Sequence, residues 1–411
     1  MKTKKDIKVN LSRYLLKSDI AFSVVHFVYR DLLKLRLKSL YDYAFENHRI
    51  VSVVNDEVFF DYYKQATTKE EYETWQYKEI EKRECSRQFI SIFKNAIVRG
   101  DTDAVIVDGC YLTDKIIFDR KGFEEHLPWR FVCTKDMCII KGTGSKIRQI
   151  PFGISLIKMW SYNYFHFVFE GLSRLGEIEK LEQYKKWPII IDECVKKDPR
   201  NVEIINLLNI NNREIIWVKQ GEFLQVGNLI QPPTLSWAVW DVPKSVNNAW
   251  GYMLDKKTGE YLRNTVLTRY TPKREYNCVF VARGNNKRLI NEDEIIEYFE
   301  EQGFSIFYPD KAVHFQDEVD CFATANCIVS CAGGASTNFV FCKPSVDIYC
   351  LLPFEFRCDN PQDVTQTVGI NSHMIDGVIK NNGGLLMSST FEIPLEKCKR
   401  IVDACKEKGY L

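Results

Sequence analysis

The sequence predicts an α/β fold with two Rossmann-like domains that face a cleft and a helical extension at the N-terminus. Its most regular part begins near residue 276, where short apolar runs alternate with amphipathic stretches, as strands and helices do in a parallel doubly wound sheet. A less regular alternation runs from about residue 100 to 232. The proline-rich stretch QPPTLSWAVWDVP lies between the two runs and indicates a domain connection near residues 235–245.

Each domain is predicted from its own set of strands and helices. Residues 11–80 contain few Gly or Pro and are expected to be mainly helical. In the first domain the expected strands are DAVIVDG (103–109), PIIIDE (188–193), EIIWV (214–218) and VGNLIQP (226–232), with a crossover helix at NVEIINLLNI. In the second domain the expected strands are YNCVFVAR (276–283), FSIFYP (304–309), CIVS (327–330) and VDIYCLLP (346–353), with helices at NEDEIIEYFEEQGF and FQDEVDCFATA.

These patterns divide the chain into four segments. We expect a helical extension over residues 1–80, a first Rossmann-like domain over 81–240 and a second over 241–390. The last segment, 391–411, contains one amphipathic helix, which is expected to pack back on the first domain.

Composition excludes several classes of protein. The formal charge of +1 gives no overall field that would select nucleic acid as a partner. Many of the 14 cysteines lie inside apolar runs, where a reduced thiol behaves as a small hydrophobe, so we expect no disulfide framework and no structural metal. The apolar run at residues 20–29 is too short to span a bilayer. We therefore expect a cytoplasmic protein whose residues 11–40 either pack on the protein itself or rest on the inner face of the plasma membrane.

A run of small residues, Ala332 to Asn338, follows the strand CIVS. Parallel strands bring their carboxyl ends to one edge, so this turn should lie near Arg283, Lys287 and Arg288 and near the loop that begins at Tyr308. Backbone amides, a helix N-terminus near Thr337 and guanidinium groups together suit a pyrophosphate. The alternative is that the glycines only allow tight packing between strand and helix. The pattern is neither G-x-G-x-x-G nor a Walker A loop.

A second candidate site lies in the stretch WSYNYFHFVFEGLSRL, residues 160–175. On a helix, His166 and Glu170 share one face, and a histidine oriented by a carboxylate can act as a general base near neutral pH. Either residue could be the base, and the alternative is a histidine that caps a backbone carbonyl. Asp192, at the end of a predicted strand, is a further cleft candidate. The pair Asp101 and Asp103 has the Asp-x-Asp form of a metal site, but it precedes its strand rather than following it.

Residues from about 276 to 353 resemble the nucleotide-binding half of glycosyltransferase family 61, and residues 160–175 resemble that family's Asn-aromatic-aromatic-His helix. The resemblance implies a GT-B fold and an inverting, metal-independent hexosyl or pentosyl transfer without a cofactor. It also implies a nucleotide-sugar donor, expected to be linked to uridine diphosphate, and a glycan or lipid-linked glycan acceptor in capsular or surface polysaccharide biosynthesis. Ala332 departs from the pattern, because the family usually has a histidine there.

The candidate residues are expected to divide between catalysis, the acceptor side and the donor side. His166 and Glu170 are the expected catalytic pair, and the expected acceptor-side residues are Asn163, Arg174 and Asp192. The expected donor-binding residues are Arg283, Lys287, Arg288, Tyr308, Gly333, Gly334, Ser336, Thr337 and Asn338. A catalytically weak nucleotide-sugar-binding protein of the same fold is the alternative. An NAD-dependent oxidoreductase is disfavoured because its glycine fingerprint is absent from the sequence.

Overall fold

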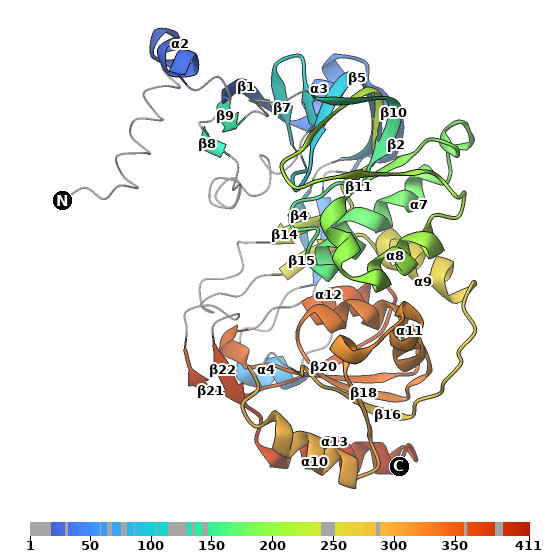
Figure 1. The fold of residues 1–411 in the computed structure, drawn as a ribbon. Helices are drawn as coiled ribbons and strands as arrows, with labels where there is room; N and C mark the ends of the chain where they lie inside the picture. Colours follow the sequence, from blue (N-terminus) through green and yellow to red (C-terminus); the bar gives the residue numbers. More distant parts are fainter. Residues whose placement is uncertain are drawn as a thin grey trace, which may run out of the picture.

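The structure of the protein is a computed structural model. It describes residues 18–28, 32–57, 59–63, 68–74, 80–85, 87–103, 105–113, 130–133, 136–141, 147–239, 251–284, 288–356, 360–382 and 389–411. These residues form a mixed α/β protein with a large mixed sheet and a separate parallel sheet, one above the other in Figure 1.

The large sheet has eleven strands, with the order β12-β11-β10-β13-β5-β6-β7-β1-β9-β8 and β2 paired to β5. Parallel pairing continues from β12 through β11 and β10 to β13, and these strands include three of the four predicted in the first half. The β13–β5 and β5–β6 pairs are antiparallel, so the sheet is mixed and extends well beyond a Rossmann-like core. The strand bounds are β1 Leu32–Lys38, β2 Ile50–Asn55, β5 Gln88–Arg99, β6 Val105–Val107, β7 Cys110–Leu112, β8 Arg130–Cys133, β9 Met137–Lys141, β10 Arg148–Ser155, β11 Ile189–Asp192, β12 Ile215–Val218 and β13 Phe223–Gln231.

The second sheet has five strands, all parallel, in the order β17-β16-β18-β19-β20. The bounds are β16 Cys278–Val281, β17 Ser305–Phe307, β18 Cys327–Cys331, β19 Asp347–Leu351 and β20 Ser372–Ile375. Helices α10 (Glu292–Glu301) and α11 (Phe315–Thr324) connect consecutive strands, as the alternation predicted. The strand order reverses at β16, because the next strand in sequence lies on one side of it and the following strands lie on the other.

The N-terminal segment differs from the predicted helical extension. Helices α2 (Asp19–Val28), α3 (Leu40–Glu46) and α4 (Lys69–Thr74) alternate there with strands, and β1 and β2 join the large sheet. The segment also contains the antiparallel pair of β3 (Phe59–Tyr63) and β4 (Ile80–Glu84). The scarcity of Gly and Pro did not distinguish helix from strand, because the decisive pairings are made with residues far along the chain. Within the described residues, no helix is long and apolar enough to cross a bilayer.

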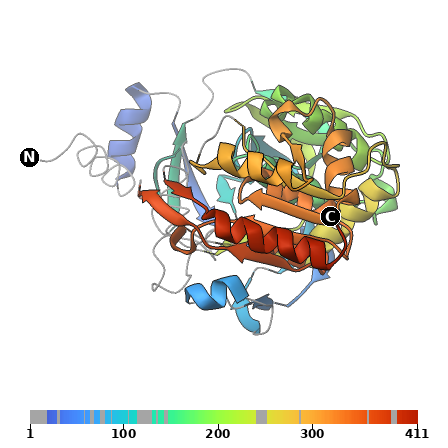
Figure 2. The same cartoon turned by 90° about the horizontal axis from the view of Figure 1, so that it is seen from below.

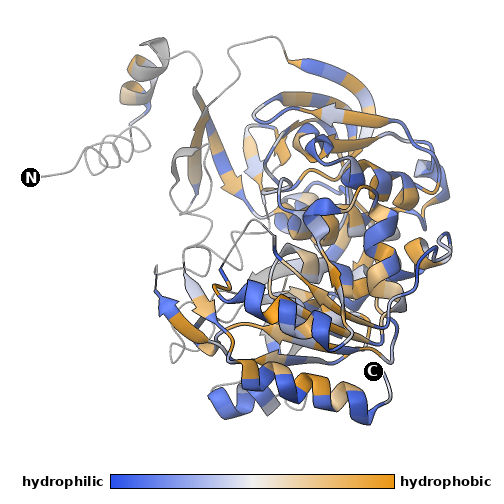
Figure 3. Cartoon of the chain, turned by 60° about the horizontal axis from the view of Figure 1, so that its bottom comes forward, coloured by the Kyte–Doolittle hydropathy of each residue, from blue (hydrophilic) through white to orange (hydrophobic). Residues whose placement is uncertain are grey.

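The C-terminal helix α13 (Leu395–Glu407) packs on the second sheet, so the predicted return to the first domain is wrong. Its apolar face buries Cys398, Ile401, Val402 and Cys405 in the same core as residues of α10 and β16. Figure 2 shows α13 and α10 side by side beneath this sheet, and both helices carry hydrophilic and hydrophobic residues in stripes (Figure 3). The helix is retained there because α10 and the sheet already offer a matching apolar surface.

Helix α9 (Lys256–Leu267) connects the two halves through a shared core. It contacts α8 (Pro199–Leu208) and the short α7 (Leu175–Ile178) of the first half, and the 3₁₀ helix η6 (Gly334–Phe341) of the second. Glycines permit close approaches of α9 to both halves: a Cβ at Gly176 would lie 2.7 Å from the Tyr261 ring, and a Cβ at Gly259 would meet the side chain of Thr367 in the second half. One continuous apolar cluster consequently contains residues from both sheets.

The remaining elements surround this junction. Helix α12 (Asn360–Gln366) contacts η6 and β15, and β14 (Ser236–Val239) pairs with β15 (Gly251–Leu254). A short hairpin-like pair is formed by β21 (Val378–Asn381) and β22 (Thr390–Glu392). The predicted domain connection falls partly on residues 240–250, which lie outside the described residues.

Candidate functional site

The point where the strand order reverses brings two predicted segments together. Strand β16 ends just before Arg283, and its neighbour β18 ends at Cys331, just before Ala332. In open parallel sheets, ligands bind outside the carboxyl ends of the strands at such a reversal. The turn from Ala332 to Asn338 therefore borders the position where a ligand of this sheet would bind.

Two predicted arginines hold this turn. Arg283 Nη1 and Arg288 Nη2 each donate a hydrogen bond of 2.8 Å to the carbonyl oxygen of Ala332. Arg288 is buried, whereas Arg283 is half-buried. Both guanidinium groups thus lie at the turn, as the topology predicted, and they fix its backbone. Lys287, the third predicted cation, lies outside the described residues.

The exposed part of the turn is its glycine backbone. Gly333 and Gly334 are exposed, while the side chains of Ser336, Thr337 and Asn338 are buried. The helix begins at Gly334, three residues before the predicted start, because Ser336 Oγ accepts a hydrogen bond from the amide of Gly333 and its own amide bonds back to Gly333 O. A Cβ at Gly334 would have no atom within 4 Å, so the space beyond this residue is open.

Tyr308 lines a surface depression of about 670 Å³ beside the carboxyl end of β17. Its ring carries the Lys311 ammonium at 3.6 Å from the ring centroid, which is a cation–π contact. Residues of α8 and α11, including Glu203 and Asp317, line the same depression. The loop that begins at Tyr308 therefore lies where the two halves of the molecule meet.

The His166 motif forms an irregular helix. Residues His166–Gly171 form a π-helix, followed by a 3₁₀ turn over Leu172–Arg174. Segments of π-helix are rare in proteins, and those that occur often lie at functional sites. His166 Nδ1 lies 2.7 Å from Glu170 Oε1, so the predicted pairing of the two side chains is present. Each of the two residues is 7% exposed, which leaves a small accessible face.

Aromatic rings surround the histidine. The Trp160 ring lies 5.1 Å from the His166 ring, and the Tyr252 ring lies 5.8 Å away. Tyr252 belongs to β15, whose amide at this residue donates to Asp363 Oδ2 in α12 of the second half. The ring environment therefore includes a residue from the junction between the halves, which places His166 near that junction.

The predicted acceptor-side residues have different environments. Asn163 is exposed, and its Oδ1 accepts from the amide of Phe165 at the start of the motif helix. Arg174 is buried, and its guanidinium donates to the carbonyls of Pro232 and Pro233 at 2.8 and 3.1 Å. Arg174 thus fastens the motif helix to the segment after β13, which spacing along the helix did not predict.

Asp192 is a buried acceptor of hydrogen bonds from three directions. It accepts from the amides of Asp101 and Lys158 and from the hydroxyl of Ser161, at 2.6, 3.3 and 2.6 Å. Burial raises the pKa of Asp192 to about 6, and these hydrogen bonds oppose the rise. Asp192 therefore anchors the loop before the motif, which is a role distinct from that of an open cleft residue.

The Asp-x-Asp pair also makes contacts within the protein. Asp101 accepts from the Trp160 amide and from Gln220 Nε2, and Asp103 forms an ion pair of 3.6 Å with Lys158. Among the described residues, no three His, Cys, Asp or Glu side chains are arranged to hold a metal ion.

The motif and the turn are also in direct contact, which no sequence pattern indicated. The Tyr164 hydroxyl donates to Asn338 Oδ1 at 2.8 Å, across 174 residues of sequence. Asn338 is thus reached from the first half of the molecule. The signal that could have suggested it is the polar Asn338 directly before the apolar run Phe339–Phe341 in η6.

Residues 164–349 match the family model described as Glycosyltransferase 61. The match begins at Tyr164 in the motif and ends in β19, so it contains both the His166–Glu170 pair and the turn after β18. The protein is therefore a glycosyltransferase, an enzyme of the class that in general takes a sugar from a nucleotide-sugar donor to a glycan acceptor. The family that these residues match is glycosyltransferase family 61, as the two motifs predicted. No curated protein matches the chain.

Proposed function

We propose that this glycosyltransferase transfers a sugar from a nucleotide sugar, expected to be linked to uridine diphosphate, to a growing glycan with inversion at the anomeric carbon. The transfer needs no metal ion, and the acceptor belongs to a capsular or surface polysaccharide. The observation that carries the proposal is the convergence of Arg283, Arg288 and the exposed Gly333–Gly334 backbone at the reversal of the parallel sheet.

This convergence suits the leaving group. Negative charge builds on the nucleoside diphosphate as the glycosidic bond breaks, and preorganised donors are the most effective means of stabilising it. The guanidinium groups bring positive charge to the turn, and the exposed backbone of Gly333 and Gly334 is accessible to phosphate oxygens. In this proposal the charge on the turn does the work that a metal ion does in other glycosyltransferases.

The His166–Glu170 pair suits the removal of a proton from the acceptor. With Nδ1–H donated to Glu170, the lone pair of the imidazole lies on Nε2, which can take the proton of the attacking hydroxyl. The acceptor oxygen then forms its bond to the anomeric carbon as the bond to the phosphate oxygen breaks. A single displacement of this kind inverts the anomeric configuration.

The arrangement of the two halves supports a GT-B fold. Residues that follow β11 meet residues that follow β17, because the Arg200 guanidinium donates to the carbonyl of Pro309. The carboxyl ends of strands from both sheets therefore approach one another, as they do around the cleft of two facing domains. In α2, the exposed Ile20 and Val24 are compatible with a peripheral contact with the inner face of the plasma membrane.

The decisive experiment is a donor screen with product analysis. The purified protein is incubated with a panel of nucleotide sugars and oligosaccharide acceptors, and released nucleoside diphosphate is measured with and without EDTA. We expect release with one donor, unchanged by EDTA, and a product whose anomeric configuration is opposite to that of the donor by NMR. A retained configuration, or activity lost with EDTA and restored by manganese, would contradict the proposal. Tight donor binding with neither transfer nor hydrolysis would establish the catalytically weak binding protein instead.

A further inference from the structure

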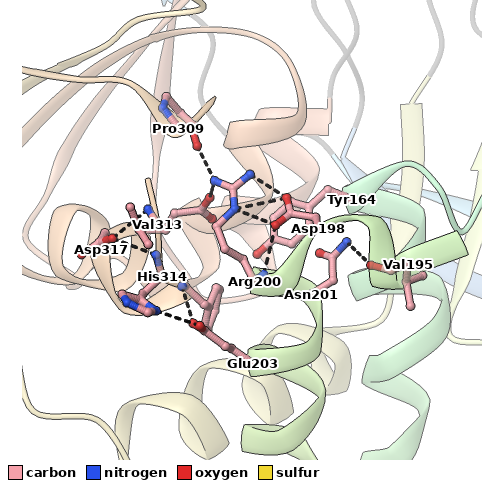
Figure 4. A network of polar contacts seen from close by, with 12 residues as sticks. Tyr164, Val195, Asp198, Arg200, Asn201, Glu203, Pro309, Val313, His314 and Asp317 are labelled. Atoms are coloured by element: carbon pink, nitrogen blue, oxygen red, sulfur yellow. Dashed lines mark hydrogen bonds and ion pairs between the residues drawn. The ribbon is translucent and has the colours of Figure 1, made fainter. Parts of the chain in front are cut away.

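A chain of hydrogen bonds joins the His166 motif to the turn from Ala332 to Asn338, called the donor turn below, and continues to α8. The Tyr164 hydroxyl donates to Asn338 Oδ1 at 2.8 Å, and Asn338 Nδ2 donates to Glu318 Oε2 at 2.7 Å. Arg200 Nη1 lies 2.5 Å from the other oxygen of Glu318. Figure 4 shows the Arg200 guanidinium between Asp198 and Pro309, with Tyr164 close to this guanidinium.

The chemistry of these groups suits the direction of donation in this chain of hydrogen bonds. Asn338 is 1% exposed, and its amide offers a carbonyl acceptor on one side and N–H donors on the other. Burial raises the pKa of the Tyr164 phenol well above its usual range, so the hydroxyl keeps its proton and donates. Burial also raises the pKa of Glu318 to about 7, although the Arg200 guanidinium favours the carboxylate. The Asn338 amide is therefore held in one orientation from both sides.

The position of the link relates two groups that must act together. Tyr164 precedes His166 by two residues, and Asn338 lies in η6, four residues beyond Gly334. Apolar packing alone tolerates small sliding movements, whereas hydrogen bonds to a buried amide fix distance and direction. Each end of the link is thus tied to one side of the proposed reaction.

We propose that Tyr164, Asn338 and Glu318 are positioning residues that set the placement of His166 relative to the donor turn. The inference rests on the proposed function, in which His166 takes the proton and the turn holds the departing diphosphate. The three residues act through these groups, and they align the attacking hydroxyl with the bond that breaks. A misplacement of about 1 Å can cost about 100-fold in rate.

The test compares Tyr164→Phe with the matched control Tyr270→Phe. The Tyr270 hydroxyl bonds to Gln316 O at 3.1 Å and to Asp320, both on α11, the helix that also carries Glu318, so its loss removes a phenol contact to that helix and leaves the hydrogen bonds of the link themselves in place. We expect Tyr164→Phe to lower kcat about tenfold or more while the KM for donor changes less than twofold. Tyr270→Phe should keep both constants near those of the wild type. Equal effects of the two variants on kcat would overturn the proposal.

A second measurement does not depend on turnover. Amide hydrogen exchange should become faster at residues 334–341 in Tyr164→Phe and in Glu318→Gln, and stay unchanged there in Tyr270→Phe, because the link restrains η6 from outside it. The double variant Tyr164→Phe/Glu318→Gln should exchange no faster than the more affected single variant, since both changes break one chain. If exchange at 334–341 is unchanged in Tyr164→Phe, the link is not a restraint and the proposal fails. If the wild type transfers no sugar from any donor, the proposed function fails, and the exchange result still decides whether the link exists.

Discussion

A methyl group at residue 333 should weaken donor binding about tenfold, whereas a methyl group at residue 334 should leave it unchanged. A Cβ at Gly333 would lie 2.7 Å from Arg283 Nη1, which is too close, so the guanidinium must move. The same Nη1 donates the 2.8 Å hydrogen bond to the Ala332 carbonyl, so the movement breaks this bond. At Gly334 a Cβ would meet no atom within 4 Å.

The expected size follows from the strength of the bond that is lost. A hydrogen bond to a charged group contributes about 1.5–3 kcal/mol. Arg283 is half-buried, and Arg288 still donates to the same carbonyl, so the carbonyl is not left without a donor. We therefore take the lower end, about 1.5 kcal/mol, which corresponds to about a tenfold change in a binding constant.

The assay is a calorimetric titration of nucleoside diphosphate into the wild type, Gly333→Ala and Gly334→Ala, with thermal unfolding as a check of folding. Gly334→Ala controls for the loss of a glycine in the same turn. If the two variants bind the diphosphate equally well, the contact between Arg283 and the turn does not contribute to donor binding, and the reasoning is refuted. A Gly334→Ala variant that alone loses binding would refute it equally, because the open space beyond that residue would then be filled by the ligand.

Four further outcomes follow from the site. Replacing the true base should lower kcat about 100-fold or more with little change in donor affinity. Steady-state kinetics of His166→Ala and Glu170→Gln test this, and near-normal turnover in both variants would place the base elsewhere. Arg288→Ala should lower kcat/KM about 100-fold, and Arg288→Lys should restore little of the loss, because lysine lacks the planar guanidinium. Full activity in Arg288→Lys would show that a positive charge at this position is sufficient for turnover. The pKa of Asp192 is raised to about 6 in the folded protein from 3.8, so the free energy of unfolding should fall by about 2.4 kcal/mol as pH rises from 4 to 7. Chemical denaturation should show a smaller fall in Asp192→Asn, and an identical pH dependence in the two proteins would contradict the assignment. Turnover should survive EDTA, which a coupled assay for diphosphate release checks, and loss of turnover reversed by manganese would direct attention to Asp101 and Asp103.

The second half of the fold was predictable because its pairings follow chain order. Buried strands such as CVFV and CIVSC alternate with amphipathic helices, and right-handed crossovers then leave few topologies. The first half was less predictable, because β5 pairs with β2 and β13, and nothing local in its sequence specifies partners so far apart. The prediction of where α13 packs was wrong for a related reason, since an amphipathic face shows that a packing partner exists without showing which one.

The site shows the same division. Topology placed Arg283, Arg288 and the glycine turn together, and helical spacing paired His166 with Glu170. Topology could not show that both guanidinium groups would bond to one carbonyl oxygen. That detail depends on side-chain conformations and on tertiary distances, which a linear pattern does not contain.

The close approaches of α9 have a consequence for protein engineering. Because Gly176 and Gly259 let this one helix fit tightly against both halves, neither half has a complete apolar surface without it. Chimaeras that exchange the donor-side half for that of another enzyme should consequently misfold unless α9 and both surfaces that receive it are transferred as a set. The intact chain should melt in a single calorimetric transition, and fragments divided before β15 should be recovered only when they are expressed together.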